Sequence, residues 1–244
     1  MTGRFPGPRP LRLDSWPWPA SWRVAVLAPH PDDFDAAGIL LRYLRRAGLD
    51  LRLLVLSSSP NGVEDSFANP PTDEAKAALR EEEQRASCRF FGLPEESIEF
   101  LRLAVGSPGG HLLDDGNSRR TLAEKLARLR PDIVLLPHGN DTNPDHRLAH
   151  AWWTRLAGEN GHAAAALLIR DPKTIASRDD AYIPFGEADA EWKCELLRFH
   201  RSQHERNLRA RGYGFDERIL RVNRESARRL GIAEPYAESF EIAD

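Results

Sequence analysis

The chain of 244 residues has only two cysteines, little net charge and no long apolar run. Cys88 and Cys194 form no Cys-x-x-Cys pair, which argues against a disulfide framework or a thiolate zinc site and favours a reducing cytoplasm. With 34 basic and 37 acidic residues the formal charge is −3, so no overall field attracts nucleic acid or an anionic membrane. No stretch approaches the roughly 18 apolar residues of a membrane-spanning helix. We therefore expect a cytoplasmic protein without nucleic-acid partners or membrane insertion.

Lysine is also scarce, since four of the 34 basic residues are Lys and 30 are Arg. The arginines are scattered along the chain, and we interpret them as compositional bias rather than as a binding patch. The chain is 41% hydrophobic, which is enough to bury one sizeable core.

Two segments differ in composition. Residues 1–21 are rich in proline, which fixes φ and removes backbone donors, so we expect an extended arm there. Trp16 and Trp18 indicate that the arm packs against the rest of the protein. Residues 22–244 show no linker or repeat and are expected to form a single domain. The prolines of the arm are Pro6, Pro8, Pro10, Pro17 and Pro19.

From residue 22 onwards, short apolar runs alternate with segments of helical spacing. Strands that alternate with helices of about ten or more residues predict a parallel sheet covered on both faces. The fold class expected is therefore α/β, with a doubly wound, mostly parallel Rossmann-like sheet. The expected strands cover residues 23–28, 51–56, 97–103, 132–137 and 163–169, and the expected helices cover 36–47, 73–91, 118–130, 191–211 and 216–230.

Two loops rich in His and Asp directly follow buried strands. Residues 28–35 read Ala-Pro-His-Pro-Asp-Asp-Phe-Asp, and residues 137–150 read Pro-His-Gly-Asn-Asp-Thr-Asn-Pro-Asp-His-Arg-Leu-Ala-His. In an open α/β sheet, ligands bind beyond the carboxyl ends of the strands. We therefore expect the functional residues in these two loops.

The loops contain the donors of a divalent metal site. His30 and Asp33 are three residues apart, and His146 from the second loop completes a set of three ligands that leaves a position open for water. Asp32, beside Asp33, is placed to accept a proton from that water. The alternative is that Asp33 or Asp35 simply caps the helix expected at residue 36.

His138 and His150 belong to the second loop as well. Each is a reserve ligand or a hydrogen-bonding neighbour of the site, and we interpret both as structural rather than as metal ligands.

Residues 30–33, His-Pro-Asp-Asp, and residues 143–146, Asn-Pro-Asp-His, resemble the motifs of the LmbE/PIG-L zinc-dependent N-deacetylases. This family includes the deacetylases of N-acetylglucosaminyl-phosphatidylinositol and of the mycothiol and bacillithiol precursors. The resemblance runs from about residue 23 to residue 240. Supporting matches are Arg80 with Glu83, residues 131–134, Lys193 through His200 with Gln203, and residues 236–240.

The resemblance implies that His30, Asp33 and His146 bind zinc and that Asp32 is the general base. Asp145, next to His146, is expected to orient that imidazole.

Arg80 matches a substrate-contacting arginine of the family. The alternative is that Arg80 forms an ion pair with Glu83 on a solvated helix face.

The chain departs from the family pattern at two positions. Many members have Glu after the paired aspartates, where this chain has Phe34, and Asp35 fits the version with an acid one residue later. Asn143 stands where many members have a histidine. An asparagine donates a hydrogen bond to an oxyanion but supplies no proton near neutral pH. Either Asp32 returns the proton to the leaving amine, or His200 or His204 does so.

The leading hypothesis is a metal-dependent hydrolase that removes an acyl group, with acetyl the expected one, from the nitrogen of an amino sugar or its conjugate. Two imidazoles and a carboxylate suit Zn²⁺, and they also suit Fe²⁺. A homo-oligomer is compatible with the sequence. Two alternatives remain: a family member that binds a sugar or a partner without turnover, because of Asn143, and an Asp-x-Asp phosphatase, because of Asp33 and Asp35.

Overall fold

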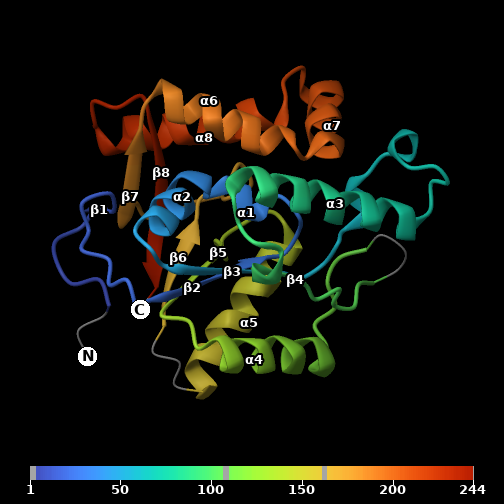
Figure 1. The fold of residues 1–244 in the computed structure, drawn as a ribbon, viewed down its shortest axis with the longest axis horizontal. Helices are drawn as coiled ribbons and strands as arrows, with labels where there is room; N and C mark the ends of the chain where they lie inside the picture. The colour runs from blue at the N-terminus through green and yellow to red at the C-terminus, as the bar shows by residue number, and fades with distance from the viewer. Residues whose placement is uncertain (1–3, 107–109, 161–163, 244) are drawn as a thin grey trace.

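The computed structural model describes residues 4–106, 110–160 and 164–243, in which eight strands form one sheet with helices on both faces (Figure 1). The strands are β1 Leu11–Arg12, β2 Arg23–Ala28, β3 Asp50–Val55, β4 Ile98–Phe100, β5 Ile133–Pro137, β6 Ala165–Ile169, β7 Ala181–Phe185 and β8 Tyr236–Ala243. The α-helices are α1 Asp33–Ala36, α2 Gly38–Arg46, α3 Asp73–Phe91, α4 Gly116–Leu129, α5 Pro144–Asn160, α6 Glu187–Arg198, α7 Arg201–Arg211 and α8 Phe215–Leu230. Short 3-10 turns cover Pro60–Gly62, Asp65–Phe67 and Glu95–Ser97.

The strand order is β1-β7-β8-β6-β5-β2-β3-β4. The pairs from β6 through β4 are all parallel, whereas β8 runs antiparallel to both β6 and β7. This confirms the expected mostly parallel, Rossmann-like α/β fold. Because β2 and β5 are neighbours, the two loops that follow them emerge side by side at one edge of the sheet.

The central strands bury both of their faces. Side chains alternate along a strand, so Val26 joins the core under α2 and α3, and Leu27 joins the core over α4 and α5. Burial on both faces explains why these strands read as continuous apolar runs rather than as alternating patterns. The helices α6, α7 and α8 form a further layer above α1, α2 and α3 (Figure 1).

Some expected elements were wrong in extent. The loop expected at residues 137–150 is a loop only as far as Asn143, because Pro144 starts α5 at the position where proline is favoured. The helix expected at 36–47 is divided into α1 and α2, and the helix expected at 191–211 is divided into α6 and α7 around His200. The third strand is shorter than expected, with only residues 98–100 in β4.

Three strands were missed entirely: the two-residue β1 within the expected arm, and β7 and β8. Pro184 inside β7 and the acidic residues Glu238 and Glu241 inside β8 interrupt the apolar pattern that identifies a strand. In the structure Glu238 is buried against the amino end of α2, where it accepts hydrogen bonds from two backbone amides.

The described part of the arm packs against the rest of the protein, as the tryptophans indicated. Strand β1 pairs in parallel with β7. Phe5 is buried, and its ring lies 5.6 Å from Trp16 and 5.8 Å from Trp18 between centroids. The division of the chain into an arm and one domain stays a prediction. Among the described residues, no helix is both long and apolar enough to cross a bilayer.

Candidate metal centre

The two loops place His30, Asp33 and His146 together at the carboxyl ends of β2 and β5. Oδ2 of Asp33 lies 3.4 Å from Nδ1 of His30, and Oδ1 of Asp33 lies 3.3 Å from Nε2 of His146. One ligand atom from each of the three residues lies within 4.8 Å of the others. The three expected ligands are therefore brought together.

The second nitrogen of each imidazole faces a buried carboxylate. Nε2 of His30 lies 2.8 Å from Oδ2 of Asp145, and Nδ1 of His146 lies 3.2 Å from Oδ2 of Asp141. A carboxylate accepts the N–H of the imidazole, which leaves the opposite nitrogen with a lone pair for a cation.

The expected partner of Asp145 was thus wrong. Neighbours in a helix point in different directions, so Asp145 reaches across to His30, and Asp141 in the preceding loop contacts His146.

The electrostatics of this cluster fit a divalent cation. Burial opposes charge on His146, yet the carboxylates of Asp33 and Asp141 outweigh it and raise the pKa of His146 to about 10. Burial also opposes ionisation of Asp33, but the imidazoles of His146 and His30 lower the pKa of Asp33 well below its ordinary value. Nε2 of His146 is buried and has no hydrogen-bond partner. The cluster therefore stabilises positive charge at a point where one nitrogen lacks a partner.

Asp141, His146 and Asp171 form a second group of possible ligands. Burial and the charge of Asp141 raise the pKa of Asp171, which disfavours two ionised carboxylates side by side. Asp141 is almost fully buried and lines neither of the cavities described below, whereas His30 and Asp33 each line one. The set with two imidazoles is therefore the better metal centre.

Asp141 and Asp171 were not singled out from the sequence. Asp171 follows the expected strand at 163–169 by two residues, so the strand-end argument applied to this third strand would have found it.

Asp32 has an unusual backbone conformation, with φ of 116° and ψ of −24°. A left-handed conformation is costly for a residue with a Cβ and persists only where its surroundings hold it. Here the backbone N–H of Asp32 donates to Oε1 of Gln84 at 3.0 Å, and Oδ2 of Asp32 lies 3.3 Å from Nη2 of Arg80. Two side chains of α3 thus fix the carboxylate beside Asp33.

Arg80 is 3% exposed, which excludes the solvated helix face considered for it. Its guanidinium contacts Asp32 and the backbone carbonyls of Pro31 and Ser59. Glu83, the alternative partner, instead accepts hydrogen bonds from the backbone and hydroxyl of Ser202.

Neither Asp33 nor Asp35 caps a helix, so the capping alternative was wrong for both. Asp33 accepts a hydrogen bond from the backbone N–H of His30. Asp35 is fully buried and contacts Ser87, Gln84 and His200. Because Asp33 and Asp35 face different surroundings, they do not form the paired carboxylates of an Asp-x-Asp phosphatase.

Asn143 has a structural role at the start of α5. Its Oδ1 accepts the backbone N–H of Asp145 at 3.0 Å, which is the bond that an N-cap residue makes. Since Oδ1 is engaged, the Nδ2 amino group is the end of this side chain that can donate to a ligand. Asn143 lines the second cavity together with His30, Asp32 and Arg80.

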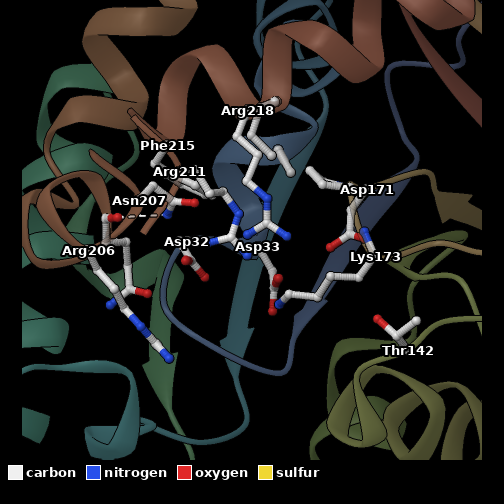
Figure 2. Close-up of a pocket in the computed structure, with 14 residues that line it drawn as sticks. Asp32, Asp33, Thr142, Asp171, Lys173, Arg206, Asn207, Arg211, Phe215 and Arg218 are labelled. Atoms are coloured by element: carbon white, nitrogen blue, oxygen red, sulfur yellow. Dashed lines mark hydrogen bonds between the residues drawn. The ribbon is translucent and has the colours of Figure 1, made fainter. Parts of the chain in front are cut away.

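Two adjoining cavities open at the cluster. One of about 340 Å³ is bordered by Asp32 and Asp33 and by the side chains of α7 and α8 (Figure 2), and one of about 320 Å³ is bordered by His30, Arg80 and Asn143. The residues common to both are Asp32, Thr142, Lys173, Gln203 and Arg206. The two cavities therefore form one cleft around the predicted ligands.

The other histidines lie as follows. His138 is held by Glu241 at 3.1 Å and stacks on His150, which agrees with structural roles. His200 is fully buried against Asp35, and His204 faces Asp216. Because neither borders the described cleft, both were wrong as alternative proton donors.

His111 borders the cleft without having been singled out, and its Nδ1 lies 3.3 Å from Asp145.

Comparisons with known proteins agree with this geometry. The profile of the PIG-L family, described as GlcNAc-PI de-N-acetylase, matches residues 25–157, more than half of the chain. No curated protein gives a significant match.

Solved structures share the fold. The N,N'-diacetylchitobiose deacetylase from Pyrococcus horikoshii is 18% identical with a TM-score of 0.74, over 91% of this chain and 84% of that chain. GalB, the 4-carboxy-2-hydroxymuconate hydratase of Pseudomonas putida KT2440, is 20% identical with a TM-score of 0.70, over 91% and 96%. A deacetylase of the teicoplanin biosynthesis pathway is 14% identical with a TM-score of 0.67, over 91% and 98%. With the strand-end motifs at 30–33 and 143–146 lying inside or beside one cleft and a family profile matching more than half of the chain, the chain belongs to the PIG-L family.

Proposed function

We propose that the protein is a metal-dependent N-deacetylase that acts on an N-acetylated amino sugar or a conjugate of one. Membership of the PIG-L family supports this reaction, as do the deacetylases among the proteins with the same fold. A cytoplasmic location remains a prediction.

The observation that carries the proposal is the convergence of Nδ1 of His30, the carboxylate of Asp33 and Nε2 of His146 beside the cleft. Each imidazole is oriented by a carboxylate on its other side. This donor set suits Zn²⁺, or Fe²⁺, which when bound supplies a positive charge that polarises an acyl carbonyl and acidifies water.

Asp32 is the proposed general base. Its carboxylate borders both cavities and does not belong to the ligand set, so it can accept a proton from an attacking water. The guanidinium of Arg80, 3.3 Å away, holds this carboxylate in place. The same carboxylate then returns the proton to the leaving amine, because no histidine stands at position 143 and neither His200 nor His204 borders the described cleft.

Asn143 is proposed to stabilise the oxyanion that forms when the amide is attacked. Its Oδ1 is fixed by the backbone of α5, so the amide plane is held in one orientation before the substrate binds. A donor that is already oriented loses little energy to rearrangement during the reaction. Arg80 borders the same cavity and is a proposed substrate contact as well as the partner of Asp32.

The test is a screen of the purified protein, loaded with Zn²⁺ or Fe²⁺, against N-acetylglucosamine and its conjugates, with detection of acetate and of free amine. Equal amounts of the two products are expected, and chelation should abolish both. Tight binding of these sugars without release of acetate would establish the alternative, a sugar-binding protein without turnover. Because a hydratase shares the fold, loss of an unsaturated carboxylate substrate without acetate would also contradict the proposal.

A further inference from the structure

The larger cavity beside the predicted metal ligands is bordered by four basic side chains, those of Lys173, Arg206, Arg211 and Arg218. Arg211 and Arg218 extend into it from the side of α7 and α8 towards Asp32 and Asp33, and Lys173 extends into it from the opposite side (Figure 2). We call Lys173, Arg211 and Arg218 the cationic wall. The arginines were interpreted from the sequence as scattered compositional bias, and the structure brings these two together at one cavity.

The turn between α7 and α8 brings the two arginines together. Gly212 ends α7 with φ of 75°, a conformation that favours glycine. At Gly214 a Cβ atom would lie 2.2 Å from Cε1 of His204, so a side chain there would displace that imidazole. This tight turn places Arg211, the last residue of α7, close to Arg218 in the first turns of α8.

None of the three cations has an ion-pair partner among the described residues. The carboxylates of the same cavity are engaged elsewhere: Asp32 with Arg80, Asp33 with the two imidazoles, and Asp171 with the backbone amides of residues 173 and 174. Partial burial and the nearby charge of Arg211 lower the pKa of Arg218, as expected for like charges held close together.

Unpaired cations that share a cavity repel one another and lose part of their hydration. Such an arrangement stabilises the complex with an anion more than it stabilises the free protein, and arginine in particular binds phosphate or carboxylate through two parallel hydrogen bonds. Elsewhere on α8, by contrast, Arg221 and Arg224 are paired with Glu217.

We propose that the substrate of this site carries a phosphate or carboxylate group and that Lys173, Arg211 and Arg218 bind that group. The proposal rests on the proposed function and names its substrate class: an N-acetylated amino sugar whose attached group is anionic. The acetamide lies in the smaller cavity, at His30 and Asn143, and the anionic group lies in the larger one.

The arrangement of the cleft supports this orientation. The two cavities share a border at Asp32 and Lys173, so one ligand can occupy both. Arg206 also borders both, but its side chain points away from the cationic wall and donates to the carbonyl of Gly62 (Figure 2). We therefore assign the anion to the other three cations.

The first experiment compares kcat/KM for three α-glycosides of N-acetylglucosamine that differ only at the anomeric oxygen: the 1-phosphate, the carboxymethyl glycoside and the neutral methyl glycoside. We expect the anionic compounds to be favoured by about tenfold or more, through a lower KM, because a hydrogen bond to a charged group contributes at least that factor. The phosphate and carboxylate arms identify which anion is preferred. Equal values for all three compounds would overturn the proposal.

Substitutions in the cationic wall test which side chains produce the preference for anionic glycosides. Arg218→Gln and Lys173→Gln, which lie on different elements, should each reduce the anionic preference by about tenfold. Arg228→Gln is the matched control, since Arg228 is an exposed arginine of the same helix that does not border the cleft. Thermal unfolding confirms that each variant is folded. A preference that survives in both Arg218→Gln and Lys173→Gln would also overturn the proposal.

Binding separates this inference from the proposed function. Calorimetric titration of the Asp32→Asn variant with N-acetylglucosamine 1-phosphate and with the methyl glycoside measures the anion contribution without turnover. Tighter binding of the phosphate, lost in Asp32→Asn combined with Arg218→Gln, supports the anion site even if the wild-type protein releases no acetate. Release of acetate without any preference in binding would leave the proposed function standing and overturn the anion site.

Discussion

The two sides of the cleft differ in how their charges are compensated. On the strand-end wall, formed by His30, Asp33 and His146, every imidazole faces a carboxylate on each side. On the cationic wall, the described residues offer no carboxylate partner to Lys173 or to either arginine. The charges of the strand-end wall are therefore compensated without a substrate, whereas those of the cationic wall would be compensated by the proposed anion of the substrate. The proposed chemistry and the proposed anion recognition thus lie in different parts of the fold.

The largest expected effect tests the strand-end wall directly. His146→Ala removes one imidazole of the ligand set and leaves Asp33 and Asp141 without their common partner, so bound metal and activity should both be lost. Metal analysis of the wild-type protein should give about one ion per chain. The matched control is His150→Ala, one turn later on the same helix, which should keep the metal. Full occupancy in His146→Ala would show that the three residues do not form the centre.

Asp32→Asn should keep the metal but lower kcat by about 10²–10⁴-fold, because an amide cannot accept the proton from water. Activity and metal content are measured on the same preparation. Wild-type turnover in a folded, metal-loaded variant would move the general base to another residue and leave Asp32 as the partner of Arg80 only.

Two substitutions at Asn143 separate its cap from its proposed catalytic contact. Asn143→Asp keeps an oxygen that can accept the amide of Asp145, whereas Asn143→Ala removes it at a cost of about 1 kcal/mol of stability. Both remove the Nδ2 donor, so both should lower kcat by about 10²–10³-fold. Denaturant unfolding checks the first effect and steady-state kinetics the second. If Asn143→Asp were as active as the wild type, Asn143 would be a cap and nothing more.

The smallest expected effect is at Arg80, which borders the smaller cavity. Arg80→Lys keeps the charge beside Asp32 but loses the planar fork that also reaches the carbonyls of Pro31 and Ser59, so kcat/KM should fall by about tenfold. Arg80→Met, which removes the charge as well, should have the larger effect. If the two variants behaved alike, the charge of Arg80 would have no part in positioning Asp32.

The strand-end wall could be predicted from the sequence because its residues follow apolar runs that are recognisable locally. His30 and Asp33 come directly after β2, and a parallel sheet brings the ends of its strands to one edge. The partners of the imidazoles could not be predicted in the same way. Whether Asp141 or Asp145 faces His146 depends on the directions of side chains around the first turn of α5, which sequence spacing does not determine.

The cationic wall could not be predicted for a different reason. Lys173 follows β6, and β7 and α6 lie between it and α7, which ends at Arg211. Arg218 lies further along the chain, in α8. In a chain with 30 arginines, nothing local distinguishes these two from Arg221 or Arg224. Only the packing of α7 and α8 above the sheet brings them to the predicted metal ligands.

The pairing of β1 with β7 has a consequence for how the protein associates. Backbone amides of Leu11 and Leu13 donate to the carbonyls of Asp180 and Tyr182, so the arm occupies hydrogen-bonding groups along the outer side of β7. Strands with unoccupied outer groups are templates for pairing with other chains, and short edges rich in proline resist it. Because β1 has only two residues and prolines lie before and after it, a second molecule can hardly extend the sheet at this edge. Shortening the arm would expose the outer side of β7 and make it available for pairing with another chain.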